Sequence, residues 1–374
     1  MVLLKKILNK SISVLTILFI IFLIDLIINL ILSENIKKTI GTTMNYSLKS
    51  EMFHHEIAPN INLLEFWGNK KYKVITNNFG MRIGENDFIN SKIKNIGFIG
   101  DSFVYGSGID YNNHFITLIK KNNKDYNYLN LGYVSYSPSI YYKKLKYFLD
   151  NKNLEFDKIF IFVDTSDIQD EGSFYREDSN GNIVRKWNSD LENKKKNFKY
   201  RYKNYLKQNS FIFKFYEIFS FNNTNEQAKK CLSEKENVNL EYIKYLDYER
   251  FGYAYDETLY SKKWVKEGQK KIIDYLSKIK KLLDLNKIEM IIVHFPSAID
   301  VLKDNKIKDN SKHYQMLNNW AQLNYVSLID TQEDFFKTKN PIKNYEKNHI
   351  ACDVHWNSSG HKIIGKNILK YITN

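Results

Sequence analysis

The sequence predicts an α/β protein, a three-layer α/β/α sandwich with a parallel sheet, preceded by one apolar helix at the amino terminus. One observation predicts the layers. Short apolar runs alternate with helical stretches beyond residue 93, and strands that alternate with helices favour a parallel sheet covered on both faces. A second observation, a 22-residue apolar run that starts at Ser11, predicts the preceding helix.

Length and composition restrict the class of protein. A chain of 374 residues holds one large domain or two modest ones, and 43% hydrophobic with 26% charged residues is an ordinary globular composition. The formal charge of +14 comes almost entirely from lysines that are spread along the chain. Because no zinc finger, RNA-recognition motif or arginine cluster accompanies it, we expect no nucleic-acid partner.

The run from Ser11 to Leu32 predicts a membrane anchor within residues 1–34. Its length corresponds to about 33 Å of helix, enough to cross a bilayer. No small residues follow in the pattern of a cleavage site, so we expect the segment to be retained. Three lysines precede the run and two follow it closely, which places residues 35–374 outside the cytoplasm.

Asp25 lies inside this run, where a charge costs about 3 kcal/mol. One interpretation is a neutral or snorkelling side chain in a single long helix. The other is a polar contact with a partner helix near Asp25.

The remaining chain divides into a membrane-proximal segment, residues 35–92, and a catalytic-type domain, residues 93–374, with an insertion at about 170–262. The segment includes a turn-like stretch at Thr76–Arg82. We expect strands at Ile96–Ile99, Tyr126–Asn130, Lys158–Val163, Glu289–His294 and Tyr325–Ile329. We expect helices at about 112–123, 138–150, 263–284, 311–323 and 358–372. The insertion is charged and aromatic, and is either a lid or substrate wall or a solvated helical elaboration.

Residues with chemical potential follow the predicted strands, and the carboxyl ends of parallel strands form the sites of such sheets. Ser102 comes directly after the first strand, and Asp353 and His355 come just before the last helix. A serine hydroxyl becomes a nucleophile when an imidazole removes its proton, and the imidazole needs a carboxylate on its other nitrogen. The set therefore predicts acyl transfer.

The blocks GDSFVYG, around Ser102, and DVHWNSSGH, around His355, resemble the SGNH/GDSL hydrolase superfamily. The D-x-H-W form of the second block is similar to the membrane-anchored, polysaccharide-acetyltransferase-like branch. The resemblance implies a flavodoxin-like sheet, no cofactor and no metal. It also implies that Ser102 is the nucleophile and first oxyanion donor, His355 the base and Asp353 its partner.

The resemblance is incomplete in the oxyanion hole. Ser135 aligns where the family has a glycine, and its backbone N–H still serves as a donor. Ser166, in the sequence Asp164-Thr165-Ser166-Asp167, stands where the family has an asparagine, and its hydroxyl is a shorter donor.

Two further residues have open interpretations. Trp356 either stacks on a substrate sugar or packs the base of its loop. Arg82 either binds an anionic group of the substrate or forms a structural ion pair.

The expected function is a serine esterase or O-acyltransferase that acts on acyl groups, foremost acetyl, of a cell-surface glycan. The expected place is a bacterial inner membrane, with the domain facing the periplasm or exterior. The alternatives are a lipid or thioester hydrolase, a non-catalytic glycan-binding or scaffold protein, and a membrane-partner role centred on Asp25. A metal cluster at His349, Cys352, Asp353, His355 and His361 fits no familiar zinc spacing, and whether Cys231 pairs with Cys352 stays open.

Overall fold

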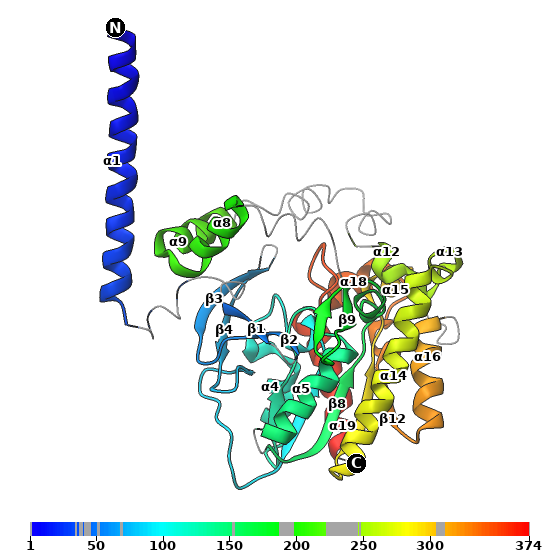
Figure 1. The fold of residues 1–374 in the computed structure, drawn as a ribbon. Coiled ribbons are helices and arrows are strands. Elements are labelled where there is room, and N and C mark those ends of the chain that lie inside the picture. Colours follow the sequence, from blue (N-terminus) through cyan, green and yellow to red (C-terminus); the bar gives the residue numbers. More distant parts are fainter. Residues whose placement is uncertain are drawn as a thin grey trace.

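The computed structural model describes residues 2–33, 36, 40, 46–50, 53–67, 70–151, 154–186, 198–221, 246, 248–303 and 311–373. Helix α1, Val2–Ile31, extends away from the sheet and its covering helices (Figure 1). Within it, Ile12–Ile31 is long and apolar enough to cross a membrane, and the described chain holds one helix of this kind. The predicted anchor is thus a candidate span by length and composition.

The centre of the domain is a parallel sheet, as predicted. Within the described residues its five strands lie in the order β7-β6-β8-β11-β12, and every neighbouring pair is parallel. Numbered along the chain this is the order 2-1-3-4-5, the flavodoxin-like arrangement. All five predicted strands are confirmed: β6 is Asn95–Ile99, β7 Asn127–Asn130, β8 Phe156–Phe162, β11 Glu289–His294 and β12 Ser327–Asp330.

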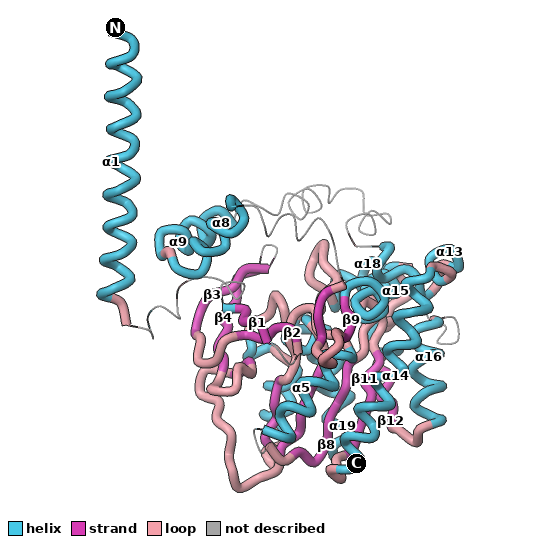
Figure 2. Tube along the Cα trace, viewed as in Figure 1, coloured by secondary structure: helices cyan, strands magenta, loops and turns pink. Residues whose placement is uncertain are grey.

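Helices cover both faces of the sheet, because successive strand residues point to opposite sides. Ile159 and Ile161 of β8 pack into one core with α5, α14 and α16, whereas Phe160 and Phe162 pack into the other with α4 and α19. Figure 2 shows the strands between these helices. The predicted helices are confirmed as α4 Phe115–Asn122, α5 Pro138–Asn151, α14 Lys263–Leu285, α16 Lys312–Leu323 and α19 Ser358–Thr373. Shorter helices flank them: α3 Ser102–Tyr105, η2 Tyr111–Asn113, α15 Ala298–Leu302, α17 Gln332–Phe335 and α18 Pro341–Asn348.

The start of α5 depends on a residue from the insertion. Pro138 is the first helical residue, as the sequence indicates, but the Ser137 hydroxyl does not cap the helix. It donates to Glu171 Oε1 at 2.6 Å, and the same oxygen accepts from the backbone N–H of Ser139 at 2.7 Å. The Glu171 carboxylate therefore accepts a hydrogen bond from a backbone N–H group in the first turn of α5, which has no partner within the helix.

The membrane-proximal segment folds into two small antiparallel sheets. One pairs β1, Ser47–Ser50, with β2, His54–Ile57, and the other has the order β3-β4-β5, namely Asn62–Trp67, Lys70–Thr76 and Arg82–Ile83. The turn between β4 and β5 lies in the predicted turn-like stretch. There Asn77 Oδ1 accepts from the N–H groups of Phe79 and Met81, at 2.9 and 3.0 Å, and Gly80 adopts φ 75°.

The insertion has two parts. One part packs on the domain and consists of α6 Asp167–Gln169, η3 Asp170–Phe174, the hairpin of β9 Tyr175–Glu177 and β10 Ile183–Arg185, α12 Tyr248–Phe251, η4 Gly252–Ala254 and α13 Glu257–Tyr260. It approaches α14 so closely that a Cβ at Gly268 would lie 2.1 Å from the carbonyl oxygen of Ile168. The other part, α8 Phe198–Asn209 and α9 Phe211–Phe221, lies beside α1 (Figure 1). Three consecutive lysines of the insertion, Lys194-Lys195-Lys196, fall outside the described residues.

Candidate active site

The candidate site lies where the strand order of the sheet reverses. Strand β6 has β7 on one side and β8 on the other, so the connections that leave β6 and β8 turn in different directions. Ser102 follows β6, and the polar sequence Asp164-Thr165-Ser166-Asp167 follows β8. A parallel sheet opens a crevice at this point, at the carboxyl ends of its strands.

A tight strand-to-helix turn presents Ser102 at this edge. Ser102 is the first residue of α3, and Asp101 caps the helix by accepting from the Phe103 N–H at 2.9 Å. The approach to this turn requires glycine, because a Cβ at Gly100 would lie 2.4 Å from the side chain of Val104. The Ser102 N–H belongs to the first turn of a helix and has no partner within that helix.

The structure brings the three predicted triad residues together, although 253 positions separate Ser102 from His355. His355 Nε2 lies 2.8 Å from Ser102 Oγ, and His355 Nδ1 lies 2.5 Å from Asp353 Oδ1. An ionised carboxylate can accept a hydrogen bond but cannot donate one. The proton of the neutral imidazole is therefore on Nδ1, and Nε2 is free to accept a hydrogen bond from the serine hydroxyl. Only one residue separates Asp353 from His355. The turn that this spacing requires is stabilised because Asp353 Oδ1 also accepts a hydrogen bond from the His355 backbone N–H, at 2.8 Å.

Opposite charges determine the ionisation of this pair. Burial alone raises the pKa of Asp353, but the His355 ring and the hydrogen bonds that the carboxylate accepts outweigh burial and lower it below its ordinary value. Burial likewise lowers the pKa of His355, and the charge and hydrogen bond of Asp353 outweigh this effect and raise it above 6.5. Asp353 is therefore ionised at neutral pH and stabilises a protonated His355.

Trp67 is a site residue that the sequence analysis did not find. Its indole N–H donates to Asp353 Oδ2 at 2.8 Å, and its ring meets the His355 ring edge-on, with centroids 4.9 Å apart. Trp67 is the last residue of strand β3, so the membrane-proximal segment contributes a hydrogen bond to the aspartate of the triad. No local signal marks this tryptophan, because 286 positions separate it from Asp353.

Several buried carboxyl groups lie close to Ser102. Asp101 Oδ2 is 3.0 Å from Ser102 Oγ, and since a hydroxyl has one proton, Ser102 donates either to Asp101 or to His355 at a given time. Burial raises the pKa of Asp101, and burial together with the Asp101 charge raises the pKa of Asp164 to about 7. Arg250, at the end of the insertion, contributes the positive charge of this group and donates to Asp170 at 2.8 Å.

The two further predicted donors of the oxyanion hole, the Ser135 backbone N–H and the Ser166 hydroxyl, differ in their availability to a substrate. Ser135 adopts φ 59°, a left-handed conformation that favours glycine, which agrees with its alignment to a glycine position. The Tyr175 hydroxyl donates to its carbonyl oxygen at 2.8 Å and thereby holds the loop. The Ser166 hydroxyl instead donates to Asp164 Oδ1 at 2.7 Å, and Ser166 is buried, so in this conformation its proton is not available to a substrate.

The structure does not place the two predicted substrate-binding residues where a substrate would reach them. Trp356 is 1% exposed and packs against the rings of Phe103 and Phe295, so it forms the base of the loop rather than a sugar platform. Arg82 is also 1% exposed, and its guanidinium donates to backbone carbonyls rather than to an acidic side chain. The four acceptors are the carbonyl oxygens of Lys73, Tyr105, Gly106 and Ile109.

The cluster around Cys352 has other roles than metal binding. Cys352 is disulfide-bonded and therefore has no free thiol, and Cys231 lies outside the described residues. Asp353 and His355 belong to the triad, and His361 packs against His114 and Phe115. Among the described residues no group of three or more His, Cys, Asp or Glu side chains is arranged to hold a metal ion.

The solved structures similar to this chain include hydrolases of the GDSL type. No family model matches the chain, and no curated protein matches it. A GDSL-like lipase from Bacteroides thetaiotaomicron is 14% identical over 76% of this chain and 90% of its own, with a TM-score of 0.37. A GDSL-family lipolytic protein from Veillonella parvula is 12% identical over 75% of this chain and 99% of its own, with a TM-score of 0.40. An acetyl xylan esterase is 14% identical over 74% and 99%, with a TM-score of 0.41.

The geometry of this chain itself defines a class. A serine, a histidine and an aspartate joined by hydrogen bonds at the carboxyl edge of a parallel sheet form the arrangement by which serine esterases and acyltransferases activate a hydroxyl.

Proposed function

We propose that this protein is a serine esterase or O-acyltransferase that removes or transfers acyl groups, foremost acetyl, through an acyl-enzyme on Ser102. The observation that carries the proposal is the hydrogen-bonded series Ser102 Oγ, His355 Nε2, His355 Nδ1 and Asp353 Oδ1, with separations of 2.8 and 2.5 Å. A histidine with a purely structural role would not need a serine on one ring nitrogen and an aspartate on the other, as His355 has.

The proposed reaction has two halves. Ser102 Oγ attacks the acyl carbon while His355 Nε2 takes the hydroxyl proton, and Asp353 stabilises the imidazolium that forms. His355 then gives this proton to the leaving oxygen, the ester bond breaks, and the acyl group remains on Ser102. In the second half water or a sugar hydroxyl attacks the acyl carbon and loses its proton to His355. The bond between the acyl carbon and Ser102 Oγ then breaks, and His355 returns the proton to Ser102 Oγ.

Backbone donors are proposed to stabilise the oxyanion. The Ser102 N–H, in the first turn of α3, and the N–H of Ser135 are the two candidates, and such donors together lower the barrier by several kcal/mol. Ser166 joins them only in a conformation in which its hydroxyl leaves Asp164.

The proposed substrate is an O-acylated glycan of the cell surface. Support comes from the candidate span in α1, from the lysines that precede it, and from the resemblance of the D-x-H-W block to polysaccharide-modifying relatives. On this proposal α1 anchors the protein in a bacterial inner membrane, and the domain faces the periplasm or exterior.

The experiment that tests the function uses full-length protein in detergent, wild type beside Ser102→Ala. Both are assayed on aryl esters from acetate to decanoate and on an acetylated polysaccharide, with and without an unacetylated acceptor sugar. We expect turnover of acetate and of the polysaccharide that is lost in Ser102→Ala, and acceptor-dependent transfer would identify an acyltransferase. Activity that rises with chain length would favour a lipid or thioester hydrolase. Saturable glycan binding without turnover would favour a non-catalytic protein.

A further inference from the structure

Two helices of the insertion are fastened to the candidate membrane span. Asp25 Oδ1 of α1 accepts from the backbone N–H of Ile212, in the first turn of α9, at 3.1 Å. One helical turn further along α1, the Asn29 amide donates to the carbonyl oxygen of Asn209, at the end of α8, at 3.0 Å. The carboxylate faces the end of α9 where N–H groups lack helical partners and the helix dipole is positive. Of the two interpretations of Asp25, these contacts favour a polar contact with a second helix, and here that helix belongs to the same chain.

These two bonds fix the depth of α9 relative to the span. Asp25 lies six residues before Ile31, where the span ends, which corresponds to about 9 Å along the helix axis. If residues Ile12–Ile31 fill the hydrocarbon core, the start of α9 lies about 9 Å inside its outer boundary. Helices that lie in the membrane interface bury their apolar face to about this depth, 5–10 Å.

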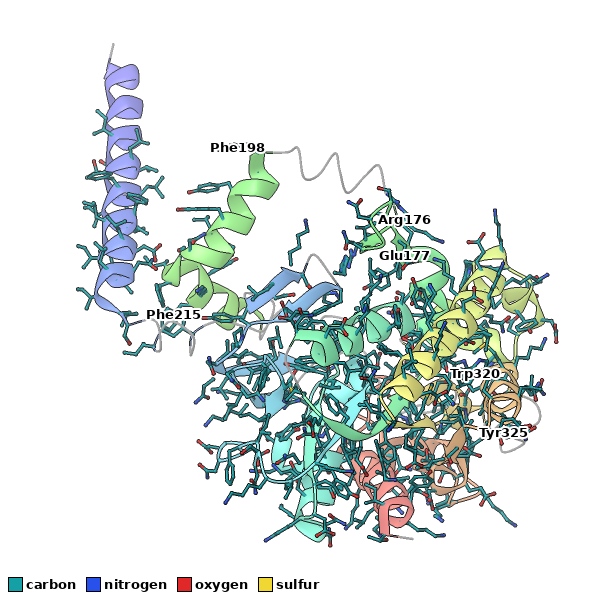
Figure 3. The ribbon with its side chains drawn as sticks, turned by 60° about the horizontal axis from the view of Figure 1, so that its bottom comes forward. Arg176, Glu177, Phe198, Phe215, Trp320 and Tyr325 are labelled. Carbon is teal, nitrogen blue, oxygen red and sulfur yellow. The ribbon has the colours of Figure 1, made fainter. Side chains whose placement is uncertain are left out.

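The surface of this helical hairpin has the composition of an interface helix. Large apolar and aromatic side chains point outward from both helices: Phe198 (80% exposed), Tyr202, Tyr205, Ile212, Phe215 and Tyr216 (64% exposed). Figure 3 shows Phe215 on the part of the hairpin near α1 and Phe198 at the end of α8 farther from α1. The sequence of α8, FKYRYKNYLKQN, has four basic residues and no acidic one, as expected for contact with anionic headgroups.

The hairpin also contacts the membrane-proximal segment. Lys214 of α9 is buried, and its ammonium lies over the ring of Tyr46, 5.3 Å from the centroid. The carbonyl oxygen of Tyr46 accepts from the Ala58 N–H at 2.8 Å, directly after strand β2. The hairpin therefore connects α1 to the segment that carries Trp67.

We propose that the hairpin of residues 198–221 lies in the outer interface of the bilayer, with its aromatic side chains at the headgroup boundary and Asp25 as its docking point on α1. The proposal rests on the anchoring by α1 proposed above and is independent of the chemistry of Ser102. It accounts for a carboxylate within an apolar span, because Asp25 finds its partner at the start of α9. It also holds the domain at a fixed height and tilt above the membrane.

The test places a photoreactive benzoyl-phenylalanine at single positions of the full-length protein in vesicles of phosphatidylethanolamine and phosphatidylglycerol, 3:1. Position Phe215 probes the hairpin. Position Phe19, in the span, is the positive control, and Tyr325, which is 97% exposed at the far side of the domain, is the matched negative control (Figure 3). After irradiation, the mass of the intact protein distinguishes a lipid adduct from a cross-link to another chain.

We expect lipid adducts at Phe215 and Phe19 and at least tenfold fewer at Tyr325. Asp25→Leu is expected to lower the adduct yield at Phe215 at least threefold without changing that at Phe19. Asp25→Asn, which keeps an acceptor oxygen, is expected to retain most of the yield. Circular dichroism and thermal melting verify the fold of each variant.

Three outcomes overturn the inference, and they have different meanings. Adducts at Phe19 but none at Phe215 leave the anchor intact and remove the hairpin from the bilayer. An adduct of twice the chain mass at Phe215 shows that a second copy covers the aromatic surface. No adduct at Phe19 contradicts the anchor itself, and with it this inference, while the Ser102 assay remains decisive for the catalytic proposal.

Discussion

The indole N–H of Trp67 donates to Asp353 Oδ2 at 2.8 Å, so each oxygen of the triad carboxylate accepts a hydrogen bond from a different part of the chain. His355 binds Oδ1, and Trp67, at the end of β3, binds Oδ2. This contact lowers the pKa of Asp353 and fixes the plane of the carboxylate, and through it the orientation of the imidazole. The membrane-proximal segment is in this way part of the catalytic geometry.

Replacement of Trp67 tests this relationship. Trp67→Phe keeps a ring against His355 but removes the donor, and we expect kcat on an aryl acetate to fall about tenfold, equivalent to about 1.4 kcal/mol, with KM little changed. Trp320→Phe is the matched control, because its indole N–H also donates to an oxygen, Ser277 Oγ at 3.1 Å, but away from the site. Equal kcat values for the two variants would refute a positioning role for Trp67.

The pH dependence of the reaction follows from the His355–Asp353 pair. The base is active when neutral, and the net effect of Asp353 raises the pKa of His355 above 6.5, so kcat/KM should fall as the pH drops through that raised value. In Asp353→Asn the charge that supports the imidazolium is gone. We expect its acid limb to move to lower pH and its kcat to drop about 10³- to 10⁴-fold. Stopped assays between pH 5 and 9 measure both, and an acid limb that does not move would contradict the assignment of Asp353.

Arg82 should matter for stability rather than for substrate affinity. Arg82→Met removes the guanidinium that donates to four backbone carbonyls, among them those of Tyr105 and Gly106 at the end of α3. We expect the free energy of unfolding to fall by about 3 kcal/mol or more, measured by urea titration, while KM of the remaining folded enzyme is unchanged. Arg176→Met, at an exposed position of β9, should leave stability within about 0.5 kcal/mol. A raised KM with intact stability would instead support a substrate-binding Arg82.

Lys144 gives a pH-dependent prediction for stability. Burial lowers the pKa of this lysine to about 7, against 10.5 in an unfolded chain. Between these values the unfolded chain holds a proton that the folded chain lacks, so a rising pH stabilises the native protein across this window. Lys144→Met removes the effect, and we expect it to melt above wild type at pH 7 by a margin that narrows toward pH 10. Lys143→Met, which loses a lysine 3.3 Å from Glu177, is the control. A margin that is constant with pH would exclude this titration.

The sheet and the triad were predictable because their signals are local. The runs at β6, β8 and β11 are short, apolar and bounded by turn residues, and Ser102 lies after β6 at the carboxyl edge of the sheet, where the sequence rule expects sites to form. The strands β3 and β4 were not predicted, since Lys70, Lys71 and Lys73 interrupt the apolar pattern of a sheet that is half exposed.

The contacts that were missed depend on tertiary structure. Trp67 meets Asp353 and Glu171 caps α5, in each case across a sequence separation that no periodicity encodes. For Asp25 a contact with a second helix was one of two interpretations, but the sequence did not identify α9 as that helix. Arg82 and Trp356 were assigned open roles because residue type suggests binding, whereas their burial shows that both are structural. Trp356 packs the base of its own loop, and Arg82 joins β4 to the chain that follows Ser102.

The measurement that tests the central claim most directly is the mass of the protein after reaction with a fluorophosphonate. Full-length wild type and Ser102→Ala are incubated with the probe, and the modified peptide is sequenced by mass spectrometry. The account predicts one adduct per chain, located on Ser102 and absent from Ser102→Ala, with Asp353→Asn reacting at least a hundredfold more slowly. A folded wild type that takes up no probe, or takes it up equally in Ser102→Ala, would contradict the claim that Ser102 is an activated nucleophile.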